Sequence, residues 1–360
     1  MDVGGTIDPR FAPVREAFAA VVAGAAGTGA AVAVWHEGTW VVDLWAGWAD
    51  AERTRLWERD SIVQPYSVSK PFAALCALVL VDRGELDLDE PVQRYWPEFL
   101  APATVRHVLS HQAGVVVLDE PAPTGVFYDW DEMCARLSRQ EPLWPPGTAH
   151  GESALFYGHL VGELVRRVDG RSLGRFLRDE VALGFAFGLT ADERARAADV
   201  TGLDEEFARK NLAGKPEIYP RAIGNPPGAR DAAVVNSVAW RAAEIPSING
   251  HGTARGAAGL YAALLQGELL SPELLAEATR AQCSGPDRVF GQDNAWGLGF
   301  AVDDDGFGMG GTGGSLAAAS AVGGYAFAFV TGSMGDHARA EAIENEFRAC
   351  LGVPPLEPVG

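Results

Sequence analysis

The chain has 360 residues, of which 48% are hydrophobic and 21% charged, a composition typical of a globular protein and not of a disordered or fibrous one. Its 29 basic and 48 acidic side chains give a formal net charge of -19, which disfavours nucleic acid and anionic membrane surfaces as partners. The amino terminus lacks a basic segment followed by an apolar run, and no stretch reaches the roughly 18 apolar residues of a membrane span. A cytoplasmic location is therefore predicted.

The predicted elements form three blocks along the chain. A helix over 11–24 is followed by two β-prone runs, 31–35 and 40–45, which indicate a hairpin. Helical spacing or helix-start signals then mark the middle of the chain, at 67–83, 90–98, 103–111, 130–139, 155–168, 174–182, 254–266 and 272–282. Three further strands are predicted at 295–302, 315–322 and 325–330, before a closing helix at 337–351.

Strands at both ends with helices between them predict one antiparallel sheet assembled from the two termini, with a helical region inserted. The active site is then expected between the two parts. Residues 184–253 have little periodicity and much Gly, Pro and Asn, so we expect long surface segments over that cleft.

Cysteine and histidine provide no sign of a metal site. The four cysteines, Cys76, Cys134, Cys283 and Cys350, are widely scattered and are expected to be buried, reduced thiols. His107 and His111 are four residues apart, but no Glu-x-x-His pattern accompanies them. We expect neither a metal nor another cofactor.

The clearest chemical signal is the segment Tyr66-Ser67-Val68-Ser69-Lys70, which precedes Pro71 and a long apolar run. Proline is tolerated in a first helical turn, so a buried helix is predicted to begin here with Ser67 and Lys70 on one face. A helix start and a nearby ammonium favour an alkoxide, and a desolvated lysine can serve as a base. Only three of the 29 basic residues are lysines, so this spacing is rarely produced by chance.

Further motifs follow in a fixed order, and together they resemble the class C β-lactamase-like esterases, or family VIII carboxylesterases, of the serine β-lactamase and penicillin-binding-protein superfamily. They are Val81 to Asp89, Pro91-Val92, Tyr95 to Phe99, Val105 to Gly114, Pro146-Gly147-Thr148, Tyr157-Gly158, Gly162 to Val165, Gly308 to Gly311 and Gly313-Gly314-Ser315. The resemblance implies an α/β (α+β) fold in which an antiparallel sheet from both termini is flanked by helices, plus an all-helical domain. We place 1–66 and 285–360 in the split α/β domain and 67–284 in the largely helical one.

The resemblance also implies acyl transfer through a covalent serine ester. Ser67 would be the nucleophile and Lys70 its activating partner. The amides of Ser67 and Thr312 would form the oxyanion hole, because Met309-Gly310-Gly311 stands where these enzymes have an edge-strand Lys-Thr-Gly or His-Gly-Gly triplet. Small esters or amides are the implied substrates.

Two positions depart from the pattern. Counting from Pro146 and from Tyr157 places the expected catalytic tyrosine at position 152, which is glutamate here, and the basic residue of the triplet has become Met309. The loss of that basic group predicts weak recognition of penicillin-like carboxylates and an apolar substrate flank at Met309.

Three interpretations of Glu152 stay open. It could act as the general base for Ser67 or for a deacylating water, or it could anchor a cationic substrate while Lys70 alone is the base. In the third, the fold performs a non-hydrolytic acyl transfer, a biosynthetic tailoring step or ligand binding alone. The leading hypothesis is a serine hydrolase in which Lys70 and Glu152 handle protons, and the oligomeric state is left open.

Overall fold

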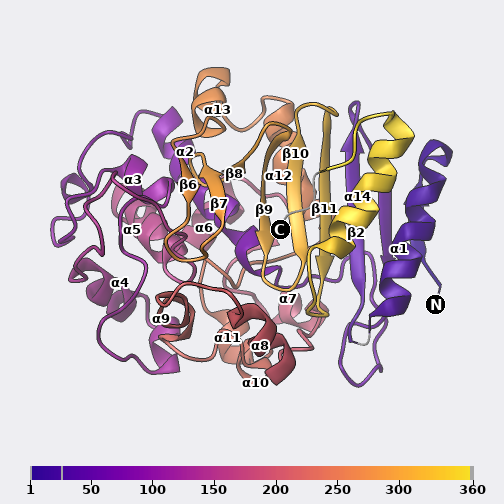
Figure 1. Cartoon of the computed structure of the whole chain (residues 1–360), viewed down its shortest axis with the longest axis horizontal. Coiled ribbons are helices and arrows are strands. Elements are labelled where there is room, and N and C mark those ends of the chain that lie inside the picture. The colour runs from indigo at the N-terminus through magenta and orange to yellow at the C-terminus, as the bar shows by residue number, and fades with distance from the viewer. Residues whose placement is uncertain (1, 26, 357–360) are drawn as a thin grey trace.

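The computed structural model describes residues 2–25 and 27–356. Figure 1 shows a twisted sheet with two helices, α1 and α14, on one face and the helical region to its other side. The strands are β1 (Gly4–Ile7), β2 (Ala30–His36), β3 (Thr39–Ala46), β4 (Phe185–Ala186), β5 (His251–Gly252), β6 (Cys283–Pro286), β7 (Asp293–Trp296), β8 (Ala301–Val302), β9 (Gly306–Gly311), β10 (Ser315–Ser320) and β11 (Tyr325–Thr331).

In the described part of the chain, nine strands form one antiparallel sheet in the order β1-β3-β2-β11-β10-β9-β8-β7-β6. Strands from the two ends of the chain pair inside the sheet, where Ala30 to His36 of β2 lie opposite Thr331 to Tyr325 of β11. Both strands are rich in Ala, with Val in β2 and Phe in β11, because both of their faces are covered. The predicted assembly of the sheet from both termini is therefore found.

The α-helices and 3₁₀ turns cover both faces of the sheet and build the helical region. The α-helices are α1 (Ala12–Gly24), α2 (Lys70–Asp82), α3 (Val105–Leu109), α4 (Trp130–Ser138), α5 (Tyr157–Asp169), α6 (Leu173–Glu180), α7 (Ala191–Arg196), α8 (Glu205–Leu212), α9 (Tyr219–Gly224), α10 (Ala232–Val235), α11 (Val238–Ala242), α12 (Ala254–Leu265), α13 (Pro272–Ala278) and α14 (Ala338–Leu351). The 3₁₀ turns are η1 (Pro9–Phe11), η2 (Tyr66–Ser69), η3 (Val92–Arg94) and η4 (Thr124–Tyr128). None of the helices in the described ranges is long and apolar enough to cross a membrane.

Each face of the sheet has its own core. Helices α1 and α14 cover one face, where Phe18, Phe329 and Phe347 pack in a separate hydrophobic cluster. Helix α12 covers the other face against β2, β10 and β11, although it lies within the range 67–284 that we predicted to be the helical domain. The domain boundaries stay a prediction.

Helix α2 is the centre of the helical region. Every residue from Lys70 to Leu80 is buried, because the helix is apolar all round and packs against α5 and α6 as well as the sheet. This surrounding shell is what removes Lys70 from water.

Glycine and proline cause the main differences between the predicted and the observed elements. The strand predicted over 295–302 is interrupted after Trp296, where Gly299 has a φ of 92°, a conformation that L side chains rarely adopt. The helix predicted over 90–98 is reduced to the turn η3, because Pro91 and Pro97 bracket it. Residues 184–253 contain two short strands, β4 and β5, and the short helices α7 to α11.

The cysteine prediction holds only in part. All four thiols are free, and Cys76 and Cys134 are buried, but Cys283 is half-buried and Cys350 is exposed. Cys350 lies near the end of α14 and faces away from the core, so its predicted burial was wrong.

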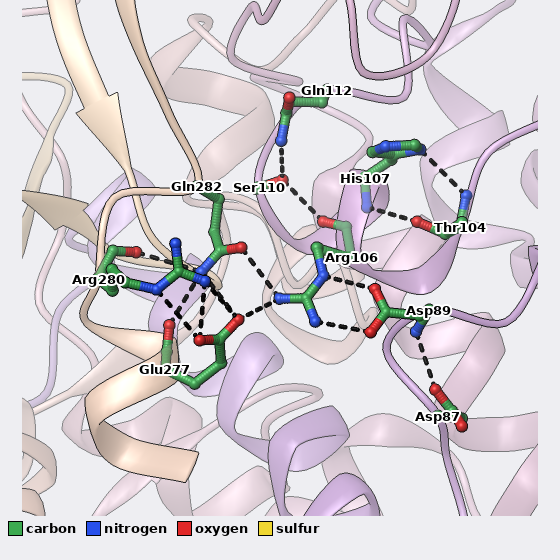
Figure 2. Close-up of polar contacts among 10 residues, drawn as sticks. All are labelled: Asp87, Asp89, Thr104, Arg106, His107, Ser110, Gln112, Glu277, Arg280 and Gln282. Carbon is green, nitrogen blue, oxygen red and sulfur yellow. Dashed lines mark hydrogen bonds and ion pairs between the residues drawn. The ribbon is translucent and has the colours of Figure 1, made fainter. Parts of the chain in front are cut away.

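A polar network holds α3 and the segment after it in place (Figure 2). Arg106 pairs with Asp89 through two contacts of 2.7 and 2.9 Å, and it also contacts Glu277 of α13 and Gln282. The Ser110 hydroxyl donates to the Arg106 carbonyl. The network fixes the residues immediately before His111, which lies behind the candidate site.

Candidate active site

Ser67 lies within the turn η2, three residues before Lys70, where helix α2 begins. The preceding residue, Tyr66, has a φ of 49°, which is strained for a side chain of its size and is held by a 3.2 Å hydrogen bond from its hydroxyl to the Ala229 carbonyl. Strand β9 approaches this turn closely at Gly311, where a Cβ atom would lie 2.0 Å from the Pro65 carbonyl oxygen. Only glycine allows this approach, so the packing of β9 against the turn that carries Ser67 requires glycine at Gly311 of the triplet.

The structure brings three of the predicted site residues into direct contact. Lys70 Nζ donates to Ser67 Oγ at 2.7 Å and lies 2.8 Å from Glu152 Oε1. The Ser67 hydroxyl lies 3.4 Å from the same Glu152 oxygen. A third contact of Nζ, at 3.4 Å, is the Ser247 carbonyl. One carboxylate oxygen therefore contacts both the Ser67 hydroxyl and the Lys70 amine.

Burial dominates the electrostatics of Lys70. Its side chain is fully buried, and this burial lowers the pKa of the ammonium below its ordinary value, while the Glu152 carboxylate opposes part of that shift. An ammonium this deep requires a paired anion and hydrogen-bond acceptors, and Glu152, Ser67 and Ser247 supply them.

The backbone around Glu152 is held by His111 and Asp287. The amides of three consecutive residues each donate to one of them: Gly151 N to the His111 carbonyl at 3.1 Å, Glu152 N to Asp287 Oδ2 at 2.9 Å, and Ser153 N to His111 Nδ1 at 3.2 Å. Because Nδ1 accepts, His111 is neutral here, and burial, with a contribution from Lys70, lowers its pKa well below the ordinary value. These two residues therefore hold the backbone from which the Glu152 side chain extends.

Asp287 also shapes the neighbouring loop. Its other oxygen accepts from the amides of Val289 and Phe290, both at 2.8 Å. Sequence reasoning missed Asp287, which is 135 residues from Glu152 and belongs to no local motif. His111 belongs to the quoted stretch Val105 to Gly114, but its role toward Glu152 was not predicted.

A small recess opens beside Ser67. Ser67 and Thr312, the two residues predicted to supply oxyanion-hole amides, both line it. Most of the other walls are apolar, formed by Leu155, Ile223, Ile248 and Phe290 among others. The segment 184–253, which we expected to cover the cleft, supplies several of these walls.

The remaining triplet residues lie beside the recess and not in its wall. Met309 is 4% exposed and is not among the described residues that line the recess, so its role as an apolar substrate flank stays a prediction. Gly310 faces the opposite side of the sheet, since a Cβ there would lie 2.8 Å from His337 Nε2.

Other polar residues near the site have structural partners. Tyr157 is fully buried and donates to the Leu109 carbonyl at 3.1 Å, and His150 contacts the Asn294 side chain at 2.8 Å. His107 takes part in the capping box of α3 with Thr104. Among the described residues, no group of three or more His, Cys, Asp or Glu side chains could hold a metal ion.

Comparison with known proteins places the chain in a family. The beta-lactamase family model matches residues 14–350. Esterase/beta-lactamase LipL of Mycobacterium tuberculosis is 33% identical, over 99% of this chain and 92% of that protein. Esterase EstB of Burkholderia gladioli is 28% identical over 72% of this chain and 71% of its own length.

Solved structures give the same result. A crystal structure of a family VIII carboxylesterase superposes with a TM-score of 0.88 at 34% identity, covering 97% of this chain and 100% of that one. A penicillin-binding-protein homologue from Caulobacter crescentus gives a TM-score of 0.87 at 33% identity, with 97% and 100% covered. The predicted β-lactamase and penicillin-binding-protein-like fold is confirmed.

Proposed function

Because this chain belongs to the beta-lactamase family and is a serine hydrolase-like enzyme with esterase relatives, we propose that it cleaves small esters or amides through an acyl-Ser67 intermediate. The observation that supports this most is the shared contact of Lys70 Nζ, 2.7 Å from Ser67 Oγ and 2.8 Å from Glu152 Oε1. A nucleophile, a cation to stabilise its alkoxide and a carboxylate to take its proton thus meet in one buried cluster.

Acylation begins when Ser67 Oγ attacks the substrate carbonyl carbon. The hydroxyl proton passes to the Glu152 carboxylate, and the Lys70 ammonium stabilises the negative charge that develops on Oγ. The carbonyl oxygen becomes an oxyanion, which the amides of Ser67 and Thr312 would bind. Collapse of the tetrahedral intermediate expels the alcohol or amine, which takes the proton from Glu152 and leaves an ester on Ser67.

Deacylation reverses the roles with water as the nucleophile. Glu152 Oε1 is the carboxylate oxygen that contacts Ser67 Oγ. A water that enters from the recess and attacks the ester carbonyl can therefore transfer its proton to Oε1. The acid is released, and the proton returns to Ser67. An alcohol that replaces this water would receive the acyl group instead.

The ion pair argues against Glu152 as an anchor for a cationic substrate. Its Oε1 atom is already 2.8 Å from Lys70, and its side chain is only 10% exposed. A substrate cation would compete with Lys70 for the same oxygen and leave a buried ammonium without its counterion, which is costly. We therefore assign Glu152 to proton transfer.

The proposal is tested with a chromogenic short-chain ester and two serine variants. Ser67→Ala should lower kcat by about 1,000-fold or more, because it removes the nucleophile. Ser69→Ala is the matched control, since Ser69 is also buried and its recorded hydrogen bond is from the Gly250 amide at 3.1 Å. Equal loss in both variants, or full activity in Ser67→Ala, would contradict the proposal.

A further inference from the structure

Arg230 gives the recess a charge that the proposed reaction does not use. Of the ten residues that line the recess in the described part of the chain, Arg230 is the only one with a formal charge. The others are apolar residues or carry hydroxyl groups. Arg230 is half-buried in a mostly apolar wall, where a guanidinium loses part of its hydration and can bind a group of opposite charge.

Its position is fixed by aromatic contacts and not by an acidic side chain. One terminal nitrogen donates to the Tyr219 hydroxyl at 2.6 Å, and the guanidinium carbon lies 5.5 Å from the centre of the Tyr219 ring. The structure records no ion pair between Arg230 and any described Asp or Glu. Arg221, nine residues earlier in the chain, pairs with Asp119 at 3.0 Å.

A second cation strengthens the positive charge at this wall. Lys215 Nζ lies 5.9 Å from the Tyr219 ring centre and 5.5 Å from that of Phe290, which lines the recess. Its recorded hydrogen bond is to the neutral Gln292 side chain at 3.2 Å. Two cations thus flank the Tyr219 ring in a chain whose net charge is -19.

We propose that the enzyme prefers esters or amides that carry a carboxylate, and that Arg230 binds this carboxylate in the recess while Ser67 attacks the scissile carbonyl. The inference rests on the proposed function, because the same recess holds the nucleophile. A guanidinium has five N–H donors in a planar fork, so the contact to Tyr219 leaves donors for a two-point contact with a carboxylate. Apolar walls strengthen that contact by excluding water.

The test compares ester pairs of matched shape that differ by one carboxylate. Mono-p-nitrophenyl adipate against p-nitrophenyl hexanoate places the charge on the acyl group, and m-carboxyphenyl hexanoate against phenyl hexanoate places it on the leaving group. In Arg230→Met, kcat/KM should fall by about 10- to 100-fold for the anionic member of at least one pair, and change by less than about threefold for both neutral esters. Arg230→Lys keeps the charge and should restore part of the loss.

Arg221→Met is the matched control, because it removes the same charge from an exposed ion pair outside the recess. It should leave the ratio of anionic to neutral kcat/KM unchanged. Equal effects of Arg230→Met on anionic and neutral esters in both pairs would overturn the inference. The proposed function would survive that result if neutral esters are still cleaved in a Ser67-dependent way, so the two failures are distinguishable.

Discussion

Replacing Glu152 with glutamine tests the unusual member of the proposed catalytic cluster. The variant keeps the size of the side chain but removes the negative charge 2.8 Å from Lys70 Nζ and the acceptor for the Ser67 proton. Loss of a positioned general base lowers the rate by about 100- to 10,000-fold. We expect kcat for a neutral ester to fall within that range and the reaction of Ser67 with a fluorophosphonate to slow in parallel.

The pH profile separates Glu152 from Lys70 as the base. Burial already lowers the pKa of Lys70, and Glu152 opposes that shift, so removing the carboxylate lowers the Lys70 pKa further. Neutral Lys70 would then predominate across a wider pH range in Glu152→Gln. If Lys70 alone were the base, the variant would keep its maximal rate and its acid limb would move to lower pH.

The assay needs a control for simple loss of a buried ion pair. Removing one partner of such a pair costs about 3–5 kcal/mol of stability, although Lys70 can reduce this cost by releasing its proton. Glu163→Gln serves as the control, because Glu163 is fully buried and pairs with Arg166 and Arg167 in the helical region. It should lower the free energy of unfolding and leave kcat unchanged. A folded Glu152→Gln enzyme with kcat within about threefold of the parent would refute the general-base assignment.

Three further predictions concern the supports of the site and the fold. Asp287→Ala leaves buried amides, including that of Glu152, without an acceptor. It should therefore lower the free energy of unfolding by about 1–3 kcal/mol and reduce kcat more than it changes KM. An unchanged kcat would show that Asp287 does not position Glu152. Burial raises the pKa of Glu344 from 4.5 to about 7, so ionisation penalises the folded state and stability should fall as pH rises across that interval. Glu344→Gln should recover at most about 3 kcal/mol in denaturant unfolding above pH 7, and the same pH dependence in both proteins would contradict this. Gly311→Ala should reduce stability and activity, because the new Cβ would meet the Pro65 carbonyl. Gly24→Ala is the control and should reduce neither, because the space around Gly24 is open. Equal stability and activity of the two variants would show that β9 can shift away from Pro65.

Local chemistry made the centre of the site predictable from the sequence. Ser67 and Lys70 are three residues apart at a helix start, and that spacing alone places both on one face. Glu152 was found by counting from flanking motifs, and its contact with Lys70 agrees with the proposed position in the cluster. Predicting the positions of these three residues requires no long-range information beyond the order of the motifs.

The supports of the site could not be predicted in the same way. Asp287 and Arg230 reach their partners only through tertiary packing, and neither belongs to a motif that marks it. The strands β2, β3 and β11 were predicted because continuous apolar runs mark buried strands, but β1 was missed because four residues rich in glycine have no periodicity to detect. Proline and glycine also interrupt a predicted helix and a predicted strand whose apolar spacing is continuous in the sequence.

The central claim is a covalent ester on Ser67, and direct detection of that ester tests it best. The protein is mixed with a p-nitrophenyl ester, quenched in acid within the first turnover, and analysed by intact mass and peptide mapping. The account predicts a mass increase of one acyl group on the peptide that contains Ser67, absent in Ser67→Ala and retained in Ser69→Ala. Ester turnover with no such adduct at any quench time, accompanied by undiminished turnover in Ser67→Ala, would contradict it.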